Sequence, residues 1–164
     1  MTDPLDEIYR EIILDHYRAP RGKKPLDSAD VSSNGHNPSC GDDIDLHLLM
    51  DNGTVKDINV NCKGCAISVA SGSMLAEYIK GKPLDEVKKI ADVVKKMLKG
   101  EEFDLSEELD NEELGDIDSL KGVRKFPVRI KCALLAWMTL IEGLKNYEDG
   151  KKSHNPTTTE KDGE

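Results

Sequence analysis

Apolar residues recur at helical spacing in four parts of the chain. This pattern predicts helices over residues 4–17, 64–81, 83–99 and about 127–147. Between the first two helices the period changes to two, which is typical of a strand with one buried face, at positions Ile44, Leu46, Leu48 and Met50. The residues Asp51-Asn52-Gly53 then predict a hairpin turn, with residues 54–62 as the returning strand.

This order of elements predicts one α+β domain, in which a small antiparallel sheet of about three strands packs against several helices. The domain is expected to span residues 1–148, and the polar residues 149–164 are expected to form a disordered tail. No apolar run approaches the roughly 18–20 residues that cross a bilayer. The first residues lack the basic region and small-residue cleavage site of a signal peptide. We therefore expect a cytoplasmic protein that has no membrane partner.

The net charge of −9 is concentrated in one segment. Residues 101–120 carry ten Asp or Glu and no Lys or Arg, so the rest of the chain is close to neutral. Such a run indicates a solvated face or mobile loop, or else a surface that docks a partner. Nucleic acid is not expected as a partner, because no basic stripe offers contacts to phosphates.

Three of the four cysteines lie at the ends of predicted elements, where functional residues gather. Cys65 begins the second helix, and Cys132 lies within the first two turns of the last one. A helix N-terminus is electropositive and favours a thiolate, and Arg129 and Lys131 add positive charge near Cys132. These two positions predict anionic sulfur, which suits reactive or metal-binding cysteines in a reducing compartment.

The stretch "NPSCGDDI" places the third of these cysteines beside carboxylates. Negative charge raises the pKa of a thiol, so Cys40 next to Asp42 is expected to be a poor nucleophile on its own. A divalent metal ion would favour both ionised groups at once. Gly41 permits a tight backbone turn that directs the side chains of Cys40 and Asp42 toward one point, and it could act as a hinge. Thiolates from Cys40, Cys65 and Cys132 with Asp42 suit zinc, or iron with sulfide.

The fourth cysteine, Cys62, forms a "CKGC" stretch with Cys65. No second C-x-x-C exists, and no strand-then-helix redox unit opens the chain. Cys62 continues the alternation of Ile58 and Val60, so we interpret it as a small buried hydrophobic residue.

The three stretches "NPSCGDDI", "GCAISVASGSMLAE" and "FPVRIKCALLAW" together resemble the U-type iron–sulfur assembly proteins, which include IscU and the N-terminal domain of NifU. The resemblance covers about residues 4–148. It implies that a metal or cluster is held by Cys40, Asp42, Cys65 and Cys132. Cys62 matches nothing in the family pattern.

Two departures from IscU resemble the SufU branch of this family. IscU has a histidine before its last cysteine and an "LPPVK" stretch ahead of it, whereas this chain has Lys131 and "KFPVRIKC". The chain also carries an extra acidic segment at about residues 101–122. The SufU branch implies zinc, a SufS-type cysteine desulfurase as partner and downstream SUF-type assembly components.

The resemblance further implies how sulfur is accepted. A histidine of the desulfurase replaces Cys40 on zinc, and Cys40 then takes the outer sulfur of the partner's persulfide. Arg129 and Lys131 steady negative charge there, pair with the partner, or are simply exposed basic residues. A scaffold for a transient iron–sulfur cluster would use the same four ligands, so it stays an alternative. A purely structural zinc module is a third, although a carboxylate ligand in a loop argues against it.

Overall fold

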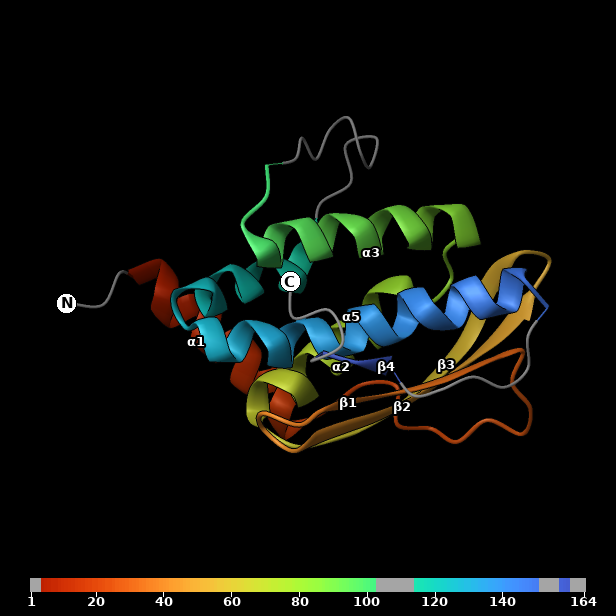
Figure 1. The fold of residues 1–164 in the computed structure, drawn as a ribbon, viewed down its shortest axis with the longest axis horizontal. Helices are drawn as coiled ribbons and strands as arrows, with labels where there is room; N and C mark the ends of the chain where they lie inside the picture. Colours follow the sequence, from red (N-terminus) through yellow and green to blue (C-terminus); the bar gives the residue numbers. More distant parts are fainter. Residues whose placement is uncertain (1–3, 103–113, 151–156, 160–164) are drawn as a thin grey trace.

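A sheet of three long antiparallel strands and one short fourth strand forms one face of the molecule in this computed structural model, which describes residues 4–102, 114–150 and 157–159 (Figure 1). β1 (Val31–Asn37) pairs with β2 (Asp42–Asp51), which pairs with β3 (Thr54–Lys63). Asn52 and Gly53 both have positive φ, as the predicted turn between β2 and β3 requires. The strands and the helices around them confirm the α+β prediction.

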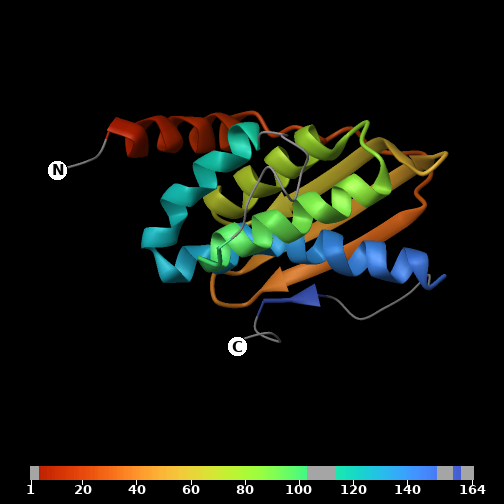
Figure 2. The same ribbon diagram turned by 90° about the horizontal axis from the view of Figure 1, so that it is seen from above.

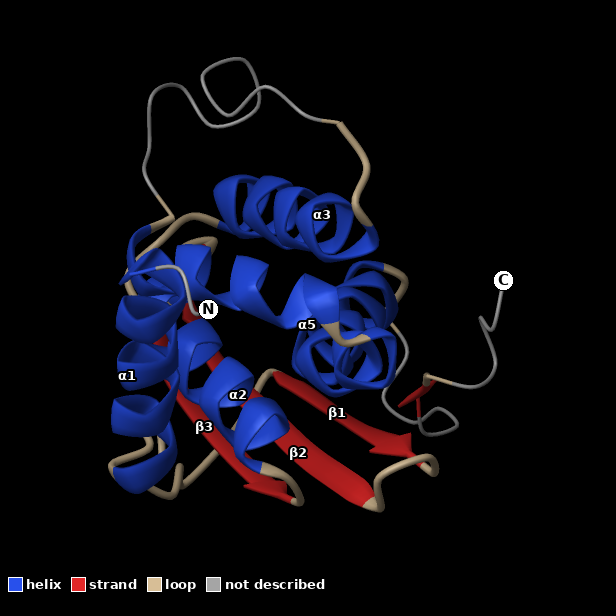
Figure 3. Cartoon of the chain, turned by 90° about the vertical axis from the view of Figure 1, so that its left-hand side faces the viewer, coloured by secondary structure: helices blue, strands red, loops and turns tan. Residues whose placement is uncertain are grey.

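The helices cover one face of this sheet in layers (Figure 3). α2 (Ala66–Ile79) and α5 (Pro127–Glu148) lie on the sheet, and α3 (Leu84–Lys99) lies over them. α1 (Pro4–Arg18) lies beside α2. Trp137 of α5 is fully buried and its Nε1 donates to Ser71 Oγ of α2 at 3.1 Å, which ties the two sheet-covering helices together. No helix in the described ranges is both long and apolar enough to cross a membrane.

The first strand, β1, has no counterpart among the predicted elements. Its buried positions are Val31, Ser33, Gly35 and Asn37, of which only one is a large apolar residue. α5 packs very close to this strand, since a Cβ at Gly35 would lie 2.1 Å from Thr139 Oγ1. Small and polar residues therefore replace the apolar alternation that would have revealed the strand.

The acidic segment is partly built into the fold. Residues 103–113 lie outside the described residues, whereas Gly115–Lys125 form the 3₁₀ helix η1. Ile117 and Leu120 of η1 are buried, and Asp118 accepts a hydrogen bond from Tyr9 of α1 at 3.1 Å. For residues 114–120, the expectation of a mobile loop is wrong, because the buried side chains of Ile117 and Leu120 anchor them to the core. The carboxylates of Asp116 and Asp118 remain 46% and 40% exposed, as expected of a solvated face.

The polar tail also departs from expectation where it is described. Thr157–Thr158 form β4, which pairs in parallel with Gly35 and His36 of β1. β1 would otherwise be an edge strand with unpaired backbone groups, and β4 satisfies some of them. The predicted disorder of residues 151–156 and 160–164 falls outside the described residues.

Candidate metal centre

The turn between β1 and β2 brings the first predicted site residues together. Asn37 and Asp42 pair across the end of this hairpin, so Cys40 lies in the turn. Asp42 continues the buried alternation of Ile44 and Leu46, and its side chain is fully buried. The fold therefore places a carboxylate inside the protein at the start of a strand.

Asp42 is held by two neutral donors. Its Oδ1 accepts a hydrogen bond from the backbone N–H of Cys65 at 2.8 Å, and its Oδ2 accepts one from Asn37 Nδ2 at 3.1 Å. The first bond satisfies an N–H at the start of α2, where Cys65 is the N-cap. When Asp42 is ionised, these neutral partners leave a full negative charge in a buried position.

The sulfur atoms gather around this carboxylate. Cys132 Sγ lies 3.2 Å from Cys40 Sγ, and Cys65 Sγ lies 3.9 Å from Asp42 Oδ2. One ligand atom from each of Cys40, Asp42 and Cys132 lies within 4.8 Å of the others. The structure thus brings all four predicted ligand residues to one place, from the β1–β2 turn, the start of α2 and the first turns of α5.

Two residues that support the site had no predicted role. A Cβ at Gly64, where φ is +147°, would lie 2.0 Å from Asp42 Oδ1, so only glycine leaves room for the carboxylate. Asn37 is fully buried, and its Nδ2 also lies 3.5 Å from Cys132 Sγ. Its signal is faint: Asn37 shares the two-residue period of Val31, Ser33 and Gly35.

Gly41 separates two of the predicted ligand residues. Its φ is +69°, in the left-handed region that glycine adopts without strain, and no atom lies within 4 Å of a Cβ built there. The predicted hinge has this conformational freedom, and its motion stays a prediction.

Burial dominates the ionisation of the deepest thiol. It raises the pKa of Cys132 well above its ordinary value, and the neighbouring sulfurs of Cys40 and Cys65 and the charge of Asp42 raise it further. The expectation that the helix start and basic neighbours favour an anionic Cys132 is therefore wrong for the protein alone. Cys62 is half-buried and packs against the core, and burial raises the pKa of its thiol to about 11.

A divalent cation fits this donor set. It would balance the charge of the buried Asp42 carboxylate and hold Cys132 as a thiolate against the cost of burial. Three sulfurs and one carboxylate oxygen match the tetrahedral preference of zinc and also suit iron. That these residues bind metal stays a prediction at this point.

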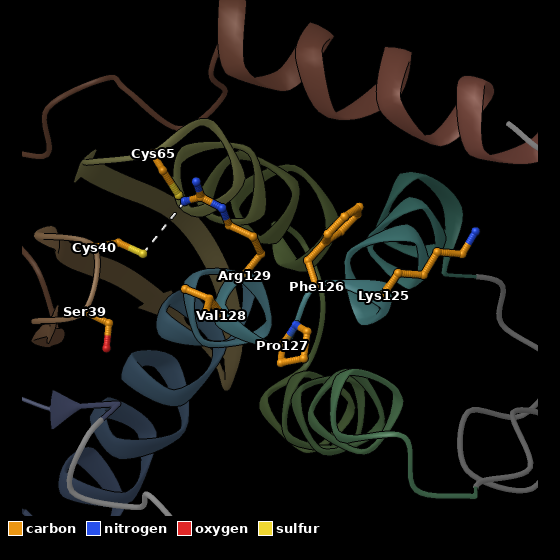
Figure 4. A pocket seen from close by; sticks show the side chains of 8 residues that line it. All are labelled: Ser39, Cys40, Cys65, Lys125, Phe126, Pro127, Val128 and Arg129. Carbon is orange, nitrogen blue, oxygen red and sulfur yellow. Dashed lines mark hydrogen bonds between the residues drawn. The ribbon is translucent and has the colours of Figure 1, made fainter. Parts of the chain in front are cut away.

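A pocket of about 670 Å³ opens beside the sulfurs (Figure 4). Cys40, Cys65 and Arg129 line it, and Arg129 Nη1 lies 3.8 Å from Cys40 Sγ. A hydrogen bond to Cys132, together with the proximity of the other cysteine sulfurs, raises the pKa of the Arg129 guanidinium, so this group is positively charged beside them. Lys131 is half-buried and does not line the pocket.

Exposed apolar side chains also line this pocket. Phe126, the N-cap of α5, is 59% exposed, and Val128 in the first turn of α5 is 60% exposed; both line the pocket. Large exposed apolar residues next to reactive groups are typical of a surface that contacts another molecule.

Comparison with known proteins gives consistent matches. Residues 8–133 match the family described as "NifU-like N terminal domain". The chain is 44% identical over 147 residues to "Zinc-dependent sulfurtransferase SufU" of Bacillus subtilis, covering 89% of this chain and 95% of that protein. It is 38% identical over 138 residues to "Iron-sulfur cluster assembly scaffold protein IscU" of Thermotoga maritima, covering 84% and 93%.

A solved structure has the same fold. The crystal structure of a putative iron–sulfur cluster assembly scaffold protein for the SUF system from Fervidobacterium islandicum matches with a TM-score of 0.74 and 34% identity. The match covers 84% of this chain and 97% of that one.

Proposed function

Because this chain belongs to the family of NifU-like N-terminal domains, within its SufU branch, we propose that it is a zinc-dependent sulfurtransferase of iron–sulfur cluster assembly. Its partner is a SufS-type cysteine desulfurase, which it stimulates by accepting persulfide sulfur. The observation that carries this proposal is the position of Cys40. It lies at a pocket, between a buried carboxylate–thiol cluster and the guanidinium of Arg129.

The metal ligands in this proposal are Cys40, Asp42, Cys65 and Cys132. Zinc bound there would hold the cysteines as thiolates at neutral pH. Asn37 and the Cys65 N–H fix both oxygens of Asp42, and the absence of a side chain at Gly64 leaves room for them. These contacts hold Asp42 in place while Cys40 reacts.

Cys40 is the acceptor because of its place in the chain. It lies in a hairpin turn next to Gly41 and lines the pocket, whereas Cys132 is fully buried. The Cys40 thiolate attacks the outer sulfur of the desulfurase persulfide. A new S–S bond forms on Cys40, the old S–S bond breaks, and the desulfurase cysteine leaves as a thiolate. Arg129 stabilises the negative sulfur before and after transfer.

The surface around Cys40 supplies the contacts for the desulfurase. The exposed side chains of Phe126 and Val128 give apolar area next to the reacting sulfur, and Arg129 and Lys131 offer positive charge. The downstream SUF-type assembly components receive the sulfur in this proposal. A cytoplasmic location is part of it, because a site of free thiolates needs a reducing compartment.

The proposal is tested by measuring desulfurase activity with zinc-loaded protein. Cys40→Ser should abolish stimulation of a SufS-type desulfurase, because the acceptor sulfur is gone. Cys62→Ser is the matched control: it also removes a half-buried thiol, but one outside the ligand set, and should retain stimulation. Circular dichroism of both variants checks their folding. Normal stimulation by folded Cys40→Ser would refute the role of Cys40.

A cluster scaffold is the second candidate, supported by the similarity to the Thermotoga protein and by the same donor set. The two functions differ in the metal that the protein carries. Protein purified without oxygen would contain iron and labile sulfide and absorb visible light if it were a scaffold. Colourless protein with zinc would favour the sulfurtransferase. A purely structural zinc module does not account for Cys40 lying at an open pocket.

A further inference from the structure

The short C-terminal strand β4 lies beside the end of the hairpin that carries Cys40 (Figure 2). Thr157 and Thr158 pair with Gly35 and His36 of β1, and the backbone N–H of Thr159 donates to the His36 carbonyl at 3.2 Å. The next residue of β1 is Asn37, which precedes the turn. Residues 157–159 therefore contact the end of β1 that leads into the turn with Cys40.

A chain of hydrogen bonds runs from this strand into the candidate metal centre. Thr159 is 5% exposed, and its hydroxyl donates to Asn37 Oδ1 at 2.9 Å. On its other side, Asn37 Nδ2 donates to Asp42 Oδ2 at 3.1 Å and lies 3.5 Å from Cys132 Sγ. Only the side chain of Asn37 thus lies between Thr159 and two predicted ligands, Asp42 and Cys132.

The chemistry of the amide fixes its orientation. A carboxylate and a sulfur are acceptors, so the two N–H groups of Asn37 must face Asp42 and Cys132. Its Oδ1 then points away from the centre, and a buried oxygen needs a donor. Thr159 supplies that donor, and without it the buried amide has an unsatisfied acceptor and is free to turn.

We propose that Thr159 is a positioning residue of the metal centre, and that β4 is a brace that acts through Asn37 on Asp42 and Cys132. Groups that orient metal ligands contribute to metal affinity although they do not touch the ion. The inference rests on the proposed function only in taking these residues as ligands. It does not depend on the desulfurase.

The test measures metal binding in full-length variants. Thr159→Val keeps the shape of the side chain and removes the hydroxyl, whereas Thr159→Ser keeps the hydroxyl. Competition with a chromogenic chelator gives the zinc affinity, and the cobalt–thiolate charge-transfer band reports the ligand arrangement. Thr159→Val should weaken zinc binding on the order of 5-fold and change the cobalt band. Thr159→Ser should match wild type.

A double mutant separates positioning from a general effect on the fold. Asn37→Ala should weaken zinc binding by about 10- to 100-fold, and adding Thr159→Val to it should cause no further loss, because both act along one path. Unchanged zinc affinity and cobalt spectrum in Thr159→Val, or a loss that Thr159→Ser fails to restore, would overturn the inference. Wild type that binds zinc without stimulating a desulfurase would refute the proposed function and leave this inference standing.

Discussion

Two groups of metal-ligating side chains occur in the described part of the chain, and they differ in how their charges are balanced. One lies in the candidate metal centre and consists of Cys40, Asp42 and Cys132, with Cys65 Sγ 3.9 Å from Asp42 Oδ2. The other, the His16 cluster, consists of His16, Glu77 and Asp116. His16 is fully buried, and its Nε2 lies 2.8 Å from Asp116 Oδ2 and 3.9 Å from Glu77 Oε1.

The His16 cluster is satisfied by the protein itself. His16 Nδ1 lies 2.7 Å from Ser73 Oγ, so both ring nitrogens have partners. Glu77 forms an ion pair with Arg21 at 3.1 Å, and both carboxylates of the cluster are about half exposed to water. The cluster joins α1, α2 and η1 and requires no further charge.

The candidate metal centre has the opposite balance. Asp42 is buried with neutral donors, and burial holds Cys132 in its protonated form. Proximity of ligand atoms is similar in the two groups, so it does not distinguish a metal site from a structural contact. A buried carboxylate that has only neutral hydrogen-bond donors does distinguish the two groups, because a bound cation would supply the charge that these donors lack.

The largest expected difference between the two groups follows metal removal. Stripping zinc with a chelator should lower the free energy of unfolding by about 4 kcal/mol, relative to protein at a free zinc concentration a thousand times its Kd. Differential scanning calorimetry measures this as a lower Tm. The same treatment should have a much smaller effect on a variant that lacks Asp42. An equal Tm with and without zinc would argue against a metal centre.

A glycine variant tests how tightly the centre is built. Gly64→Ala places a methyl group against Asp42 Oδ1 at a strained φ, so it should cost roughly 3 kcal/mol of stability and weaken zinc binding. Gly53→Ala is the matched control, since its φ of +77° is also left-handed but open space surrounds it. It should cost about 1 kcal/mol with zinc affinity unchanged. Urea unfolding and chelator competition measure both, and equal zinc affinity in the two variants would contradict the described packing of Asp42.

A smaller effect is expected at the His16 cluster. His16→Ala removes a buried link between α1, α2 and η1, and it should cost about 2 kcal/mol in urea unfolding. Zinc affinity should stay at the wild-type value, because this cluster does not contact the centre. A marked loss of zinc binding in this variant would show that the two groups are not independent.

The helices α1, α2, α3 and α5 and the β2–β3 hairpin were predictable because their apolar residues follow a clear period, whereas the 3₁₀ helix η1 was not predicted. α3 and α5 begin and end within about two residues of the predicted bounds. β1 was not predictable in this way, since Ser33, Gly35 and Asn37 face the core and adapt to the close approach of α5. β4 is two residues long and forms only because β1 offers a free edge, which no local pattern records.

In the candidate site, too, some residues were predictable from the sequence and others were not. The candidate ligand residues were predicted from cysteine positions and from the resemblance of three short motifs, and the structure brings them together. Their supports were not, because the roles of Gly64, Asn37 and Thr159 arise from contacts between segments far apart in the chain. The pKa of Cys132 was misjudged for the same reason: charges near it in sequence favour a thiolate, but its burial is a property of the fold.

The most direct test of the metal centre is the metal content per chain of protein purified without oxygen, measured by inductively coupled plasma mass spectrometry. Wild type should carry one equivalent of metal, Asp42→Ala should lose most of it, and Glu77→Ala in the His16 cluster should keep it. Metal retained in Asp42→Ala, or lost in Glu77→Ala, would contradict the assignment of the site to Cys40, Asp42, Cys65 and Cys132.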